Sequence, residues 1–350
     1  MAARRSSGRR AQKDPKWADW SDEDLLEMPF CDLGLRLEDT PLQQALEDIQ
    51  DEFAQRELRM KPYAWLSTDW FTPDGMTGFA APFYLAHPRL ARLERSQMLE
   101  LEGGTSEWCR RIMRHEAAHA LDNAYGLHRR KDWAQTFGRF ASPYNTSYTP
   151  DPSSREHVLH LYFWYSQSHP AEDYAETFAV WLPPGSHWRS RYEGWGALRK
   201  LEYIECLAEE LAGKPPKLRT RRFEEPLESL KRTIGSYYAD KRQLYADEGT
   251  PAFDGQLLRL FSDPEHARSG DPTAASFLSK HRRRLVRHVV RITGQHAYLV
   301  DHVVVELMRR SRSRRLRLTA SADEALLDAA VLLTSLTMQF LHGAHPRYQR

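Results

Sequence analysis

Cysteine is scarce in this sequence, and Cys31, Cys109 and Cys206 are widely spaced and odd in number. This pattern argues against a disulfide framework and a cysteine-based zinc site. Long apolar runs are also missing, so no segment is long enough to cross a bilayer. The basic start, MAARRSSGRRAQKDPKW, lacks the apolar middle of a secretory signal. We therefore expect a cytoplasmic protein that acts away from membranes.

The sequence has no excess of one charge, because 50 Lys and Arg residues stand against 48 Asp and Glu residues. The formal net charge of +2 gives no overall attraction to nucleic acids or acidic membranes. Hydrophobic residues make up 41% of the 350 positions, which is enough to build one large domain or two modest ones.

Composition shifts along the chain predict three parts. Residues 1–20 are expected to be a disordered basic tail. Residues 21–214 mix helical spacing with an aromatic-rich stretch that is typical of strands. The polar, proline-containing stretch 213–226 is predicted to be a linker. Beyond it, residues 215–350 are predicted to form a mostly helical C-terminal domain.

The predicted elements of the first domain indicate an α+β fold with a small antiparallel or mixed sheet. Strands are expected near residues 63–70 and 79–86, separated by the turn residues Pro73, Asp74 and Gly75. Helices are expected wherever apolar residues recur with a helical period. The predicted helices cover residues 39–59, 105–126, 170–182, 201–213, 227–247, 274–293, 297–312 and 322–341.

The stretch RHEAAHALD contains His115, Glu116 and His119 inside one predicted helix. Residues i and i+4 lie on one face of a helix, so His115 and His119 can bind one zinc ion together. Glu116 lies about 100° round the helix, within reach of a water on that ion. This is the HExxH arrangement, in which the glutamate is the general base. The alternative is a pair of core histidines that hydrogen-bond to the backbone.

A catalytic zinc ion needs a third protein ligand and one open position. The best candidate is in HPAEDYAETFAVW, where Pro170 suits the start of a helix. Glu172 and Glu176 then share one face of that helix. We expect Glu172 to bind the metal and Glu176 to accept the free ring N–H of a zinc-bound histidine. Glu172 could instead only stabilise the first turn of the helix.

Neighbours of Glu172 also bear on the ligand set. His169 could replace Glu172 as a ligand, but its position before Pro170 favours a role as helix cap. Asp173 points about 100° away from Glu172 and is expected to face solvent or bond to the backbone.

These two motifs together resemble those of a known group of enzymes. HExxH followed by a distant glutamate on a second helix is the gluzincin pattern. YSQSHPAEDYAETFAVWL (165–182) and TGFAAPFYLAHPRLARLE (77–94) resemble a bacterial family of zinc-binding metallopeptidases. AEDYAETF is distantly similar to the ligand helix of the anthrax lethal factor catalytic domain, and HEAAHALD to the Mlc titration factor peptidases. The resemblance implies a zincin-like domain and assigns oxyanion stabilisation to Tyr165.

Together these observations predict a zinc-dependent peptidase or amidase. His115, His119 and Glu172 would hold Zn²⁺, and Glu116 would activate a metal-bound water. The substrate would be a peptide or protein, whose backbone could pair with the strand near 79–86. No other cofactor is expected, and no sequence feature indicates the oligomeric state.

Two other functions stay open. The chain could be a zincin-like binding or regulatory module without activity. It could also bind nucleic acid or a protein partner through the basic segments 280–292 and 309–318. Base-stacking aromatic residues are not interleaved in these segments, so nucleic acid is the less favoured partner. In the helix at 280–292, an apolar stripe that includes Leu278, Leu285, Val289 and Ile292 is expected to pack inward.

Overall fold

The computed structural model describes residues 14–144, 148, 151, 153–219, 221–246, 254–267 and 270–343. These residues group into two compact units, each built from segments far apart in the sequence. The first unit takes its residues from Met1–Leu93, Gly103–Gly126 and Leu211–Tyr238, and the second from Glu94–Glu102, Leu127–Glu210 and Ala239–Arg350. These units are groups of contacting residues and do not show which segments fold independently. The domain boundary predicted near residue 214 therefore stays a prediction.

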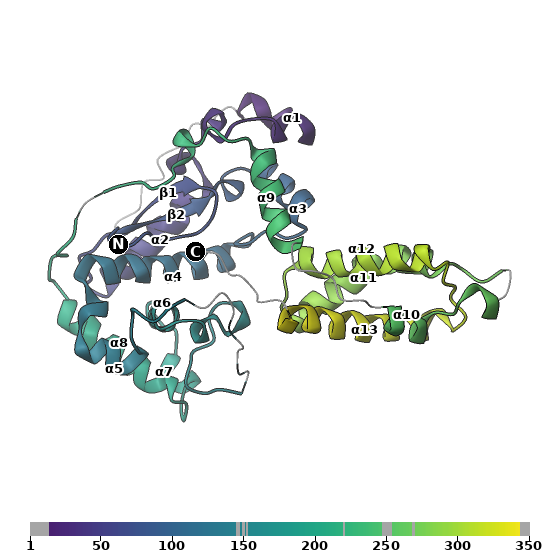
Figure 1. The fold of residues 1–350 in the computed structure, drawn as a ribbon. Coiled ribbons are helices and arrows are strands. Elements are labelled where there is room, and N and C mark those ends of the chain that lie inside the picture. Colours follow the sequence, from purple (N-terminus) through teal and green to yellow (C-terminus); the bar gives the residue numbers. More distant parts are fainter. Residues whose placement is uncertain are drawn as a thin grey trace. The chain divides into compact units, whose positions relative to one another are not determined.

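The described chain is mixed α+β and mostly helical, with one small sheet (Figure 1). The α-helices up to the sixth are α1 (Asp22–Leu26), α2 (Pro41–Gln55), α3 (Pro88–Met98), α4 (Ser106–Tyr125), α5 (Lys131–Phe137) and α6 (Pro170–Trp181). The later ones are α7 (Trp188–Arg191), α8 (Ala197–Leu211), α9 (Ile234–Ala246), α10 (Asp254–Leu260), α11 (Ala274–Thr293), α12 (Ala297–Ser313) and α13 (Ala322–Gly343). Within this part of the chain no helix is both long enough and apolar enough to cross a bilayer.

The N-terminal tail was predicted to extend to residue 20, but ordered structure begins earlier. A short 3₁₀-helix covers Lys16–Asp19, and the Trp17 side chain is buried. Its indole N–H donates to the carbonyl oxygen of Leu33 at 2.9 Å. The buried Trp17 ring and the hydrogen bonds of Arg89 to the carbonyl of Trp20 fasten this segment. Residues 1–13 of the predicted tail lie outside the described residues.

The sheet consists of β1 (Tyr63–Ser67) and β2 (Gly78–Pro82), which pair in parallel. The prediction of an antiparallel or mixed sheet is therefore wrong for this pair. The connection crosses to the other edge of β2, where Phe71 forms an isolated antiparallel bridge with Ala80. The predicted turn then returns the chain into β2, with the N–H of Met76 donating to the carbonyl of Pro73. The edge of β2 that was expected to bind a substrate backbone is thus partly paired.

The stretch predicted as a linker lies along β1. Tyr63, Trp65 and Ser67 are every second residue of the strand, so their side chains lie on the same face. They donate hydrogen bonds of 2.7–2.9 Å to backbone carbonyls in residues 222–225. The Tyr63 hydroxyl also accepts from the N–H of Arg222. A segment fastened at three successive inward positions is not a free linker, so that prediction is corrected.

The four helices α10–α13 share one apolar core, as expected for the C-terminal region (Figure 1). The predicted bounds of α11, α12 and α13 agree with the structure to within two residues. The predicted apolar stripe of α11 is buried at Leu278, Leu285 and Val289. Ile292 is 63% exposed and does not pack inward. It lies in the last turn of α11, next to the C-terminal Gly294, where the helix leaves the core.

Helix α4 is fixed against the rest of its unit by a pair of charged side chains. It packs on α2 and β2. Arg114 donates two hydrogen bonds to Glu52 of α2, at 2.6 Å and 2.8 Å. The two side chains are only 15% and 12% exposed, so the bidentate pair is largely removed from water. Arg114 directly precedes His115, so the pair and the buried apolar face of α4 together fix the helix next to the motif.

Replacing Glu52 with Ala should lower the free energy of unfolding by about 3 kcal/mol, because it leaves the Arg114 charge without its partner. Urea unfolding followed by circular dichroism measures this loss. Glu47→Ala is the matched control, because Glu47 is exposed on the same helix. It should change the free energy by less than about 0.5 kcal/mol. Equal effects of the two substitutions would contradict the role given to the ion pair.

Candidate metal centre

Helix α4 has the caps that its sequence predicts. The Thr105 hydroxyl accepts a hydrogen bond from the N–H of Trp108, and Gly126 ends the helix with a φ of 67°. A left-handed conformation of this kind favours glycine. Between these ends, the helical period places His115 and His119 one turn apart on the same face. His115 is buried and His119 is half-buried.

The two imidazole rings lie edge-on to each other at 75°, with their Nε2 atoms 3.1 Å apart. Two nitrogen ligands at about 2.0–2.1 Å from a tetrahedral ion would be about 3.3 Å apart. The observed separation is close to this value, so both nitrogens fit a single ion. The same distance also allows one ring to donate a hydrogen bond to the other.

Glu172 completes a group of three possible ligands. One nitrogen atom each from His115 and His119 and one carboxylate oxygen from Glu172 all lie within 4.8 Å of one another. His115 and Glu172 are buried and His119 is half-buried. Two neutral imidazoles and one carboxylate form a donor set that suits a transition-metal ion such as Zn²⁺. This group could therefore hold a metal ion, as its sequence pattern predicts.

Glu116 is held by a residue that the sequence analysis missed. Its carboxylate accepts a hydrogen bond of 2.8 Å from the Thr72 hydroxyl. The turn after Thr72 is in turn fastened to α4, because Asn123 donates to the carbonyls of Pro73 and Met76 at 3.0 Å and 2.9 Å. Thr72 precedes an ordinary turn sequence, and no spacing in the sequence marks it as a partner of α4.

His169 caps α6 and is not a metal ligand. Its Nδ1 accepts from the N–H of Ala171 at 3.1 Å, so the ring proton is on Nε2. That Nε2 lies 3.0 Å from the carbonyl oxygen of Ser142 and donates to it. Both ring nitrogens are thus hydrogen-bonded, and the group of possible metal ligands contains Glu172 and not His169.

Tyr144 is a second residue that the sequence did not reveal. Its hydroxyl donates to Oε1 of Glu172 at 2.8 Å, and its ring stacks on His169 with centroids 3.6 Å apart. The stack and the hydrogen bond together orient the carboxylate. Tyr144 lies in a polar, turn-rich stretch without periodic spacing, so no local signal connects it to Glu172.

Glu176 is completely buried on α6. Its Oε2 accepts a hydrogen bond of 2.7 Å from the N–H of Leu161. This bond holds the start of the 3₁₀-helix Tyr162–Gln167, which packs against α6 and contains Tyr165. The expected contact of Glu176 with a histidine ring, and the catalytic role of Tyr165, stay predictions.

Asp173 does not face solvent, contrary to expectation. It is buried, and Lys200 of α8 donates to its Oδ2 at 2.6 Å. Burial raises the pKa of Asp173 to about 7, and the Lys200 charge opposes this shift. His157 lies 3.9 Å from the same oxygen, and burial together with Lys200 lowers its pKa to about 4. Asp173, the residue beside Glu172, therefore has Lys200 as its cationic partner.

Comparison with models of known families, with curated proteins and with solved structures gave no match for this chain.

The purified chain should bind one zinc ion, and His119→Ala should weaken that binding by more than about 100-fold, because a ligand is lost rather than only a supporting contact. Competition with a chromophoric chelator measures the affinity. His266→Ala is the control, because His266 is exposed and lies outside the group. If His119→Ala retained the affinity of the unaltered chain, the group would not be the metal site.

Proposed function

We propose that this chain is a zinc-dependent peptidase or amidase of the gluzincin type. The observation that carries the proposal is the grouping of His115, His119 and Glu172, with Glu116 next to the first histidine in the sequence. Three protein ligands from nitrogen and oxygen donors leave one coordination position open, as catalytic zinc sites require. When bound, zinc supplies Lewis-acid activation of water and of the scissile carbonyl.

Glu116 is the residue we assign to proton transfer. It would take a proton on its carboxylate and deliver that proton to the leaving amine. The Thr72 hydroxyl occupies one carboxylate oxygen, Oε2, at 2.8 Å. This contact restricts the rotation of the side chain and leaves Oε1 as the oxygen that would exchange the proton. The bond between Thr72 and Glu116 is thus a positioning contact in the proposed mechanism.

Tyr144 and Tyr165 would have separate functions. Tyr144 already donates to Glu172, so we assign it to orienting that ligand. Tyr165 is held in a segment that Glu176 fastens to the helix of Glu172. A hydroxyl donor near the site would stabilise negative charge that develops on the substrate oxygen. We therefore keep Tyr165 as the proposed oxyanion donor.

Glu116→Gln should abolish cleavage of a peptide library while zinc affinity stays within about threefold, because the amide cannot accept the proton but is the same size. Mass spectrometry of the library gives the turnover. Glu107→Gln, an exposed position on the same helix, is the matched control and should cleave normally. If Glu116→Gln cleaved as fast as the unaltered chain, the general-base assignment would be wrong. If neither protein cleaved any peptide while both bound zinc, the chain would be a binding module.

The two tyrosines should be separable by their phenylalanine variants. Tyr165→Phe should lower kcat by about 100-fold with unchanged zinc affinity, as loss of an oxyanion donor does. Tyr144→Phe should weaken zinc binding by about tenfold, because it removes a hydrogen bond to a ligand. Steady-state kinetics and chelator competition on both variants check this. A kcat loss in Tyr144→Phe at saturating zinc, with normal kcat in Tyr165→Phe, would transfer the catalytic role to Tyr144.

A further inference from the structure

Helix α13 has apolar side chains on two opposite faces. One face is buried in the core that α13 shares with α10, α11 and α12, and it consists of Ala325, Ala329, Leu333 and Leu336. The opposite face begins at Leu327, which is 67% exposed. A helix that is apolar all round normally has partners on every side. The second face of α13 therefore indicates a further partner.

The exposed face is a continuous stripe. Leu327 and Val331 are 67% and 63% exposed, and Thr334 and Met338 continue the face as half-buried residues. Ten large hydrophobic side chains are exposed in the part of the chain that the structure describes. Within this set, only Leu327 and Val331 lie one turn apart on one helix. Single exposed apolar residues are ordinary, whereas a contiguous group marks an interaction surface.

The spacing along this stripe is that of a helix pair. Positions 327, 331, 334 and 338 are separated by four, three and four residues, which is the d-a-d-a sequence of a heptad. This period of 3.5 residues keeps a seam aligned between two neighbouring helices. The stripe is about 17 Å long, from the rise of 1.5 Å per residue. The partner that fits this face is therefore another helix.

The charges beside the stripe define the arrangement of the pair. Asp323 and Asp328 are exposed and occupy a g and an e position, which contact each other across a parallel pair. Their like charges disfavour that arrangement. In an antiparallel pair, Asp328 lies opposite the exposed Ser335, in a half of the helix that has no acidic residue. The same acidic side chains, with Glu324, would be repelled by an anionic membrane.

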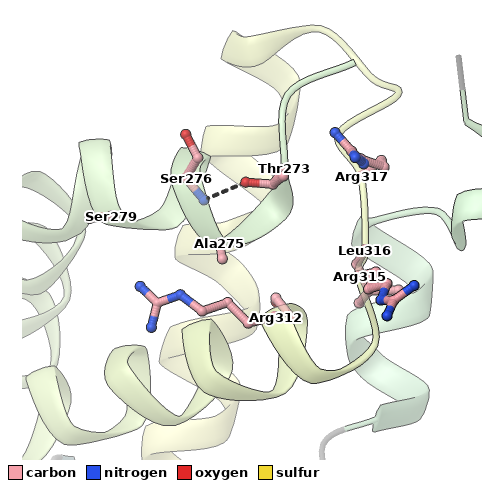
Figure 2. Close-up of a pocket in the computed structure, with 9 residues that line it drawn as sticks. Thr273, Ala275, Ser276, Ser279, Arg312, Arg315, Leu316 and Arg317 are labelled. Atoms are coloured by element: carbon pink, nitrogen blue, oxygen red, sulfur yellow. Dashed lines mark hydrogen bonds between the residues drawn. The ribbon is translucent and has the colours of Figure 1, made fainter. Parts of the chain in front are cut away.

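The other surface features of this helical region do not form a comparable surface. A cavity of about 420 Å³ lies between the start of α11 and the end of α12. Figure 2 shows that the guanidinium groups of Arg312, Arg315 and Arg317 point in different directions there, so they do not converge on one ligand. Ile292 is as exposed as Val331, but it is a single residue in the last turn of α11.

We propose that the exposed face of α13 binds the same face of a second copy of this chain, as an antiparallel, two-fold symmetric helix pair. Such a contact is self-complementary, because Leu327 of one copy faces Met338 of the other and Val331 faces Thr334. No charged side chain lies in the seam. The stripe is short, and stable interfaces bury about 1,200–2,000 Å². The dimer is therefore a weak one that forms with rising concentration.

Sedimentation equilibrium of the full chain between about 1 µM and 300 µM tests the proposal, and a monomer–dimer equilibrium is expected. A reductant is required, because Cys206 is exposed. Val331→Glu should weaken the dimer by more than about 30-fold, since it places a charge in the seam. Ile292→Glu is the matched control, because Ile292 is equally exposed on α11, and it should dimerise normally. Circular dichroism checks that both variants keep their helices.

Ser335→Lys tests the direction of the pair. In the antiparallel arrangement the new lysine lies opposite Asp328 of the other copy, once on each side of the two-fold axis. It should tighten the dimer by about threefold at low salt, because two exposed ion pairs are added. An unchanged or weaker dimer would overturn the antiparallel arrangement.

Three results would overturn the dimer itself. The first is a monomer at every concentration with a normal circular dichroism spectrum. The second is equal weakening by Val331→Glu and Ile292→Glu, which would indicate unspecific hydrophobic association. The third is a monomer that floats with vesicles of phosphatidylserine and phosphatidylcholine and loses this binding in Val331→Glu, which would assign the face to a membrane. None of these outcomes depends on the metal centre.

Discussion

The approach of two imidazoles on one face of α4 is the constraint on which the rest of the candidate site depends. Their Nε2 atoms can share an ion only if the helix is regular through His115 and His119 and has the correct rotation. The regularity comes from defined caps at Thr105 and Gly126. The buried apolar face of α4 and the bidentate pair of Arg114 with Glu52 hold the helix against its unit. Features distant from the metal chemistry thus determine whether that chemistry is possible.

The buried carboxylates near the candidate site are a second constraint, because each one needs a hydrogen-bond donor or a cation. Glu116 has the Thr72 hydroxyl, Glu176 has a backbone N–H, and Asp173 has the Lys200 ammonium. Glu172 accepts from the Tyr144 hydroxyl and lies within 4.8 Å of possible ligand atoms of His115 and His119. A divalent cation held by these three residues would offset the charge of the buried carboxylate.

The features that the sequence could predict depend on residues that are close together in the chain. Apolar periodicity and capping residues gave α2, α4, α6 and the C-terminal helices, and the helical repeat placed the two histidines together. The missed features depend on contacts that are distant in sequence. The parallel direction of the sheet follows from a crossover, and the segment after Lys214 is bound by alternate side chains of β1. Thr72 and Tyr144 approach their glutamates from loops, where no periodicity exists. Asp173 was misplaced because its partner, Lys200, lies on another helix.

A crystal structure of the chain grown with zinc, with anomalous data collected on both sides of the zinc absorption edge, tests the central claim most directly. We expect one strong anomalous peak bonded to nitrogen atoms of His115 and His119 and to a Glu172 oxygen, at about 2.0–2.2 Å. One further position on the ion should be open or filled by solvent. A peak elsewhere, or a zinc ion bound by the histidines with Glu172 turned away and no other acid in its place, would contradict the account.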